Sequence, residues 1–166
     1  MNPKDRGTAF ELEVAKLLSR WFDPSTKVDY FWRTHGSGAV SSLRQTCDSL
    51  DGDIMSIRPE TSSLMKHLVI ECKRRKSLDL LSFLDRRKIK KEENELLSIF
   101  REGKRKYAPK TFWLVARRDA GSSLLITDMK FDVRHISLNG EVLIYNLEDV
   151  LEKYTYDQIL SLVTNS

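Results

Sequence analysis

The sequence predicts an α/β fold in which helices flank a mixed central β-sheet. Three observations support this prediction. An amphipathic helical pattern opens the chain, three strand-like segments follow it, and a helical segment separates the third of these from a fourth. A strand–helix–strand crossover places the helix on a face of the sheet that the two strands share. The predicted order is therefore αβββαβ, followed by further strands and a closing helix.

The first helix is predicted from apolar residues that recur at helical spacing between Phe10 and Trp21. Asn2 and Pro3 form a typical helix start, because asparagine caps the first turn and proline is tolerated within it. Pro24 disfavours helical backbone at the residue before it, so the helix is expected to end near Asp23.

Four core strands are predicted from segments rich in β-branched, aromatic and aliphatic residues. They cover residues 28–34, 52–59, 67–73 and 111–118. Residues 35–52 are predicted to form a loop, because they contain glycine and serine and show little periodicity. Residues 60–66 are predicted to be a connector.

A second long helix is predicted for residues 92–107, although Gly103 is unfavourable in a helix and is a candidate for an early end. The basic segment 74–91 before it is expected to be an irregular arm or a short helix. Further strands are expected at 123–129 and 141–147, before a closing helix from about Leu147 to Leu162.

Length and composition indicate one globular domain over residues 1–166, with a core at about 3–118 that residues 119–166 complete. The chain has 166 residues, 40% hydrophobic and 31% charged. Its N-terminus lacks the apolar run of a signal peptide, and no stretch approaches the roughly 20 apolar residues of a membrane helix. Cys47 and Cys72 make a poor disulfide framework. We therefore expect a cytoplasmic protein with no membrane partner.

Basic residues are concentrated between Glu71 and Lys110. This segment holds fourteen Lys and Arg against seven Asp and Glu, a net charge of +7, so the rest of the +4 chain nets −3. Such asymmetry predicts a surface that faces a polyanion, for which nucleic acid fits best. A solvated helix face is the alternative that composition leaves open.

The third predicted strand carries an acid and a base on one face. Side chains alternate along a strand, so Glu71 and Lys73 share a face with Val69. Asp53 opens the second strand, and a hairpin between these two strands would bring its carboxylate close to Glu71. Mg²⁺ suits such a pair, because it binds oxygen and is commonly held by one or two carboxylates. A surface salt bridge is the alternative.

A further acid lies on the first predicted helix. Glu11 falls at the edge of the apolar stripe, next to Ala15 and Leu18, from where a carboxylate can reach over the sheet. Glu13 lies at the opposite edge of the stripe, and periodicity does not choose between the two acids.

Four short motifs, taken in this order, resemble the PD-(D/E)XK nuclease superfamily, and within it the Holliday junction resolvase branch. They are Gly7 to Glu11, Arg33 to Gly38, Gly52-Asp53, and Glu71-Cys72-Lys73. The resemblance spans about residues 6–118 and implies a restriction-endonuclease-like core. Two features depart from the family's pattern: Gly52 stands where proline is usual, and the connector before Glu71 is longer than a tight hairpin.

Carried onto this sequence, the resemblance implies a Mg²⁺ ion, with Mn²⁺ as a possible substitute, held by Asp53 and Glu71. Glu11 would assist at the metal directly or through water, and Lys73 would position the nucleophile. Ser37 would help to bind the scissile phosphate, and Arg33 would contact the DNA backbone nearby.

We therefore expect a metal-dependent DNA endonuclease that acts on branched DNA as a homodimer. The basic residues expected to contact phosphates are Arg74, Arg75, Lys76, Arg86, Arg87, Lys88, Lys104 and Lys106. Apolar residues between Leu80 and Leu84 are candidates for the dimer contact, or equally for the core. The alternatives are a general or nicking DNA nuclease and a DNA-binding module that has lost catalysis.

Overall fold

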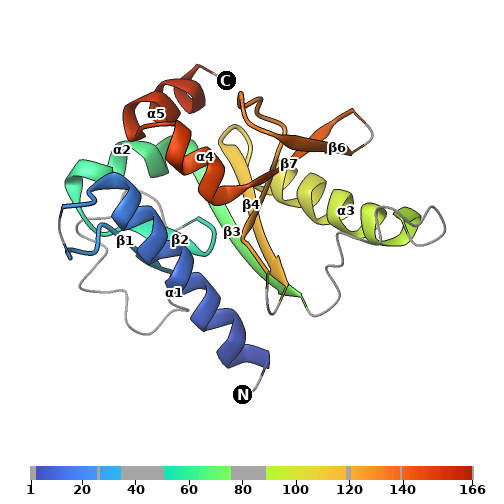
Figure 1. Ribbon diagram of the computed structural model, residues 1–166, viewed down its shortest axis with the longest axis horizontal. Helices are drawn as coiled ribbons and strands as arrows, with labels where there is room; N and C mark the ends of the chain where they lie inside the picture. Colours follow the sequence, from blue (N-terminus) through green and yellow to red (C-terminus); the bar gives the residue numbers. More distant parts are fainter. Residues whose placement is uncertain are drawn as a thin grey trace.

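The computed structural model describes residues 3–25, 27–34, 51–75, 89–118, 121–138 and 140–165. Within them the chain forms an α/β fold with a five-stranded mixed sheet and a separate two-stranded sheet (Figure 1). The helices are α1 (Pro3–Phe22), α2 (Pro59–His67), α3 (Ile89–Tyr107), α4 (Leu147–Lys153) and α5 (Tyr156–Thr164). The strands are β1 (Phe31–Arg33), β2 (Ile54–Ser56), β3 (Leu68–Arg75), β4 (Thr111–Arg118), β5 (Leu124–Thr127), β6 (His135–Leu138) and β7 (Val142–Asn146).

The larger sheet has the strand order β3-β4-β5-β7-β6. Strands β3 and β4 run parallel in the register Leu68↔Thr111, and the other pairs are antiparallel. The predicted crossover through a helix is confirmed, since α3 joins the two parallel strands. β3 is the edge strand among the described residues, so one side of its backbone is open to other partners.

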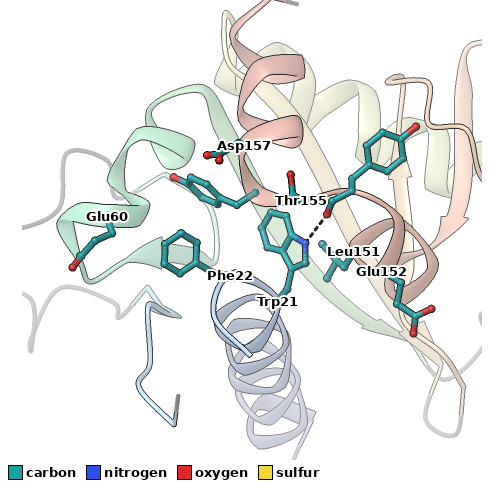
Figure 2. Close-up of a pocket in the computed structure, with 9 residues that line it drawn as sticks. Trp21, Phe22, Glu60, Leu151, Glu152, Thr155 and Asp157 are labelled. Atoms are coloured by element: carbon teal, nitrogen blue, oxygen red, sulfur yellow. Dashed lines mark hydrogen bonds between the residues drawn. The ribbon is translucent and has the colours of Figure 1, made fainter. Parts of the chain in front are cut away.

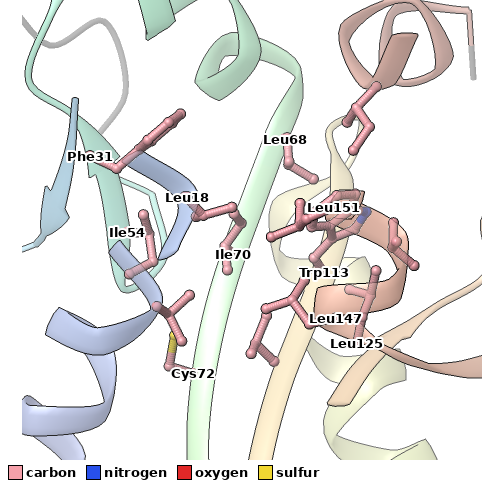
Figure 3. Packing of buried hydrophobic residues seen from close by; sticks show 14 of the residues in the cluster. Leu18, Phe31, Ile54, Leu68, Ile70, Cys72, Trp113, Leu125, Leu147 and Leu151 are labelled. Atoms are coloured by element: carbon pink, nitrogen blue, oxygen red, sulfur yellow. The ribbon is translucent and has the colours of Figure 1, made fainter. Parts of the chain in front are cut away.

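Helices cover both faces of this sheet, with α1 and α3 on opposite sides of β3 and β4 (Figure 1). Leu18 of α1 packs on the face that carries Ile70 and Cys72, as Figure 3 shows. The opposite face carries Val69 and buries Phe100 of α3. Each fully buried aliphatic or aromatic side chain contributes about 1.5–3 kcal/mol of transfer free energy. Because Val69 faces α3, alternation along β3 also directs Glu71 and Lys73 to the α3 side of the sheet.

The connector predicted for residues 60–66 is wrong, because this segment forms helix α2. Pro59 lies in its first turn, where its missing N–H costs no hydrogen bond. Thr61, Leu64 and Met65 are buried at helical spacing and pack the helix against the core.

The hairpin predicted between the second and third strands is also wrong. β2 pairs antiparallel with β1, with Trp32 opposite Met55, and helix α2 then separates β2 from β3. The first two strands are shorter than predicted, whereas β4 covers the predicted residues 111–118.

The C-terminal part also differs from its prediction. Strand β6 was not predicted, and the single closing helix is divided into α4 and α5. Thr155 causes this division, because its hydroxyl accepts a hydrogen bond from the Gln158 N–H while the Gln158 side chain accepts from the Thr155 N–H. This capping box starts a new helix.

Gly103 does not end α3, which continues to Tyr107. A Cβ atom at this position would lie 2.2 Å from Cζ of Phe112. Glycine is therefore required here because β4 approaches the helix closely, which is a packing reason and not a helix-end signal.

A pocket of about 540 Å³ opens where the end of α1 meets α4 and α5 (Figure 2). Trp21, Phe22 and Tyr156 line it, and Trp21 Nε1 donates a 2.8 Å hydrogen bond to the Tyr154 carbonyl. None of the predicted site residues lines this pocket, so the predicted chemistry lies elsewhere. Among the described helices, none combines the length and the apolar character needed to cross a membrane.

Candidate active site

Asp53 is anchored on the open edge of β3. Its N–H donates to the Ile70 carbonyl at 2.8 Å, and its Oδ2 accepts a hydrogen bond from the Cys72 N–H at 2.8 Å. Asp53 therefore satisfies the edge of β3 in the way that a neighbouring strand would. The aspartate reaches this strand although β2 and β3 do not form the predicted hairpin.

Gly52 makes this close approach possible. Its φ is +77°, in the left-handed region, and a Cβ atom would lie 2.6 Å from the Ile70 carbonyl oxygen. Only glycine adopts this conformation without cost and leaves room for the β3 backbone. The glycine that replaces the family's usual proline thus has a structural reason in this chain.

Glu71 and Lys73 lie beside this aspartate. Lys73 Nζ lies 3.2 Å from Glu71 Oε2 and 4.0 Å from Asp53 Oδ2. The Glu71 side chain is 16% exposed, against 30% for Asp53 and 38% for Lys73, so solvent and a ligand can reach the group. The structure therefore brings the three residues together around one ammonium group.

Tyr107, at the end of α3, also belongs to this group. Its hydroxyl donates a 2.8 Å hydrogen bond to Glu71 Oε1 and accepts one of 2.6 Å from Lys106 Nζ. Lys106 Nζ itself lies 3.8 Å from Glu71 Oε1. Lys106 was predicted to contact phosphate, whereas Tyr107 was not among the predicted site residues. The contact depends on the close packing of α3 on the sheet, for which Gly103 leaves room.

Glu71 is a carboxylate at neutral pH. Burial raises its pKa, but the hydrogen bond from Tyr107 and the charge of Lys73 outweigh that effect, so the pKa lies below its ordinary value. Burial and the hydrogen bond to Glu71 raise the pKa of Tyr107 against the opposing effect of Lys106. The phenol therefore keeps the proton that it donates to Glu71.

Glu11 and Glu13 lie in different surroundings. Glu11 Oε2 lies 3.3 Å from Arg33 Nε, whereas Glu13 pairs with Arg117 and has a side chain that is 52% exposed. Burial, followed by repulsion from Asp53, raises the pKa of Glu11 against the opposing charge of Arg33. The charge of Asp53 is therefore among those that act on Glu11.

The two carboxylates on β3 and before β2 are a suitable donor set for Mg²⁺. The described residues contain no cluster of three His, Cys, Asp or Glu side chains that could hold a metal ion. Glu11 pairs with Arg33 and does not complete such a cluster. However, Mg²⁺ needs only one or two carboxylates when water and substrate phosphate supply the other ligands, so Asp53 and Glu71 fit it.

The predicted phosphate contacts are described only in part. Arg74 Nη1 donates to the Arg6 carbonyl at 3.5 Å, and Lys104 forms an ion pair with Asp128. The Lys106 side chain is 62% exposed above Glu71. The other predicted contacts lie outside the described residues: Ser37, Lys76, Arg86, Arg87 and Lys88. The backbone of Arg75 is described, but its side chain is not. The candidate dimer residues 80–84 lie outside them as well.

The fold and the order of its motifs are those of the PD-(D/E)XK nuclease class. A helix, strands with an aspartate, and a strand bearing Glu-x-Lys followed by a crossover helix occur in the expected order, in a restriction-endonuclease-like arrangement. The model of the family described as "Phage putative PDDEXK endonuclease" matches residues 2–161, and the chain belongs to this family. No curated protein and no solved structure matches the chain.

Proposed function

We propose that this protein is a Mg²⁺-dependent DNA endonuclease whose reaction centre is formed by Asp53, Glu71 and Lys73. One observation carries the proposal: a single lysine ammonium lies within 4.0 Å of two carboxylates that β3 and its edge hold in place. A surface salt bridge would not need a left-handed glycine and two hydrogen bonds with the β3 backbone to hold its aspartate.

Asp53 and Glu71 would hold the cation, and Mn²⁺ would be accepted in its place. When bound, the cation supplies Lewis-acid activation of water and offsets charge that develops on the phosphate. Lys73 would then turn from the carboxylates to position the attacking water and to neutralise phosphate charge. Glu11 would assist from α1, with its charge balanced by Arg33.

Arg74 and the basic residues that follow it would track the DNA backbone without reading bases. Arg74 and Arg75 continue β3 directly beyond Lys73, so these two residues would lie close to the scissile phosphate. Ser37 and Arg33 would contact the backbone from the segment before Asp53.

For the substrate we propose branched DNA, cut by a homodimer, on the resemblance of the motif order to junction resolvases. A second candidate is a general or nicking DNA nuclease. The family description favours it equally, because it names an endonuclease without a substrate shape.

A cleavage assay on matched DNA tests these candidates. A four-way junction, a nicked duplex and a linear duplex of the same sequence are incubated with the protein and Mg²⁺, Mn²⁺ or EDTA. Metal-dependent cuts restricted to the junction support the resolvase, and cuts in all three support the general nuclease. Binding without any cut in either metal contradicts the enzymatic proposal.

A further inference from the structure

We propose that Tyr107 is a positioning residue that selects which oxygen of Glu71 faces the reaction centre. This inference rests on the proposed function, because it concerns how Glu71 is prepared to bind a cation. It concerns a residue on α3, a helix otherwise expected to supply only phosphate contacts.

The two oxygens of Glu71 have different partners. Oε1 accepts the hydrogen bond of the Tyr107 hydroxyl at 2.8 Å, whereas Oε2 lies 3.2 Å from Lys73 Nζ. Lys73 is also the group that contacts Asp53. Because Tyr107 holds Oε1, Oε2 is the oxygen that faces Lys73, the ammonium that also lies beside Asp53, and it is the oxygen available for a cation.

The Tyr107 ring is itself held in place. It stacks on Phe112 with ring centroids 5.8 Å apart and an interplanar angle of 19°. Phe112 is 1% exposed and also contacts Phe100, and Gly103 lets α3 approach this ring closely. The hydroxyl position is therefore determined by the core, so it can orient a half-buried carboxylate without losing much conformational entropy of its own.

Lys106 cannot replace this contact. Its ammonium lies 3.8 Å from Glu71 Oε1, and its side chain is 62% exposed. A lysine at the surface neutralises charge but does not fix the rotation of a carboxylate. Groups that orient a metal ligand through a hydrogen bond typically affect metal affinity by 10–100-fold when they are removed.

The test compares Tyr107→Phe with Tyr30→Phe. Tyr107→Phe removes only the hydroxyl and keeps the ring on Phe112. Tyr30→Phe is the matched control, because its hydroxyl also contacts a carboxylate, that of Asp23, at 3.2 Å. Mn²⁺ binding without DNA is measured by electron paramagnetic resonance. Cleavage as a function of Mn²⁺ concentration, DNA affinity in Ca²⁺ and the urea unfolding midpoint are measured as well.

We expect Tyr107→Phe to bind Mn²⁺ about 10-fold more weakly and to need correspondingly more Mn²⁺ for half-maximal cleavage. Its DNA affinity and unfolding midpoint should match those of Tyr30→Phe, which should bind Mn²⁺ as the wild type does. A wild-type protein that binds Mn²⁺ and cuts DNA, beside a Tyr107→Phe variant with the same Mn²⁺ affinity, overturns this inference alone. A wild-type protein that neither binds Mn²⁺ nor cuts overturns the proposed function as well.

Discussion

Replacing Gly52 with alanine should cost more in free energy of unfolding than the same substitution in an ordinary turn, and it should disrupt the site. Alanine in the left-handed region costs about 1–2 kcal/mol. In addition, the new Cβ atom would lie 2.6 Å from the Ile70 carbonyl oxygen, and strand backbone yields little. Overpacking of this kind costs about 1–3 kcal/mol, so we expect a total loss of about 2–5 kcal/mol in the free energy of unfolding.

Gly140→Ala is the matched control. Gly140 also has a positive φ, +72°, but a Cβ atom there would meet no heavy atom within 4 Å. It should lose only the backbone contribution of about 1–2 kcal/mol. Both variants reduce the conformational freedom of the unfolded chain equally, so this contribution cancels in the comparison.

The assay is urea denaturation of both variants. Cleavage is also measured, at a temperature where both variants are folded. If the chain relieves the overlap by moving Asp53 off β3, stability falls less, but the two hydrogen bonds of Asp53 and the cleavage activity are lost. A Gly52→Ala variant as stable and as active as Gly140→Ala would contradict this role of Gly52.

Three further predictions concern packing, pH and salt. Gly103→Ala should lower the free energy of unfolding by about 1 kcal/mol in urea denaturation, because overlap with Phe112 outweighs the higher helix propensity of alanine; a gain in stability would contradict this. Glu11→Gln should raise the melting temperature slightly at pH 7, because the raised pKa of Glu11 makes its ionisation unfavourable in the folded state. The gain should shrink as pH falls through the raised pKa of Glu11 and should be lost below the ordinary carboxyl pKa of 4.5, where the acid is protonated in both states; a gain that grows in acid would reject this sign. Neutralising the three basic residues 74–76 should lower the salt slope of DNA binding by about 2–3, and an unchanged slope would remove them from the footprint.

Much of the fold could be predicted because its core elements have local patterns. The first helix shows one apolar stripe, and β4 is a continuous apolar run bounded by polar residues. Helix α2 was missed because its pattern is short: Thr61, Leu64 and Met65 make a single buried turn. Local propensity alone does not stabilise a nine-residue helix, because so short a helix depends on tertiary packing. A connector was therefore predicted for this segment.

The site could be predicted as a set of residues but not as a geometry. Glu71 and Lys73 follow from alternation on one strand, whereas the position of Asp53 depends on a left-handed glycine and on two long-range backbone contacts. Tyr107 reaches Glu71 from 36 residues away, and only the packing of α3 on the sheet determines that contact. Long-range contacts of this kind leave no periodic signal in the sequence.

The most direct test that Asp53 and Lys73 form the reaction centre is cleavage by Asp53→Asn and Lys73→Ala, beside Lys16→Ala as an exposed lysine control on α1. Each variant is assayed with Mg²⁺ on the DNA that the wild type cuts, and DNA affinity is measured in Ca²⁺. We expect both site variants to lose at least about 100-fold in cleavage rate while binding DNA nearly as well as Lys16→Ala. Wild-type cleavage rates in both site variants would contradict this expectation.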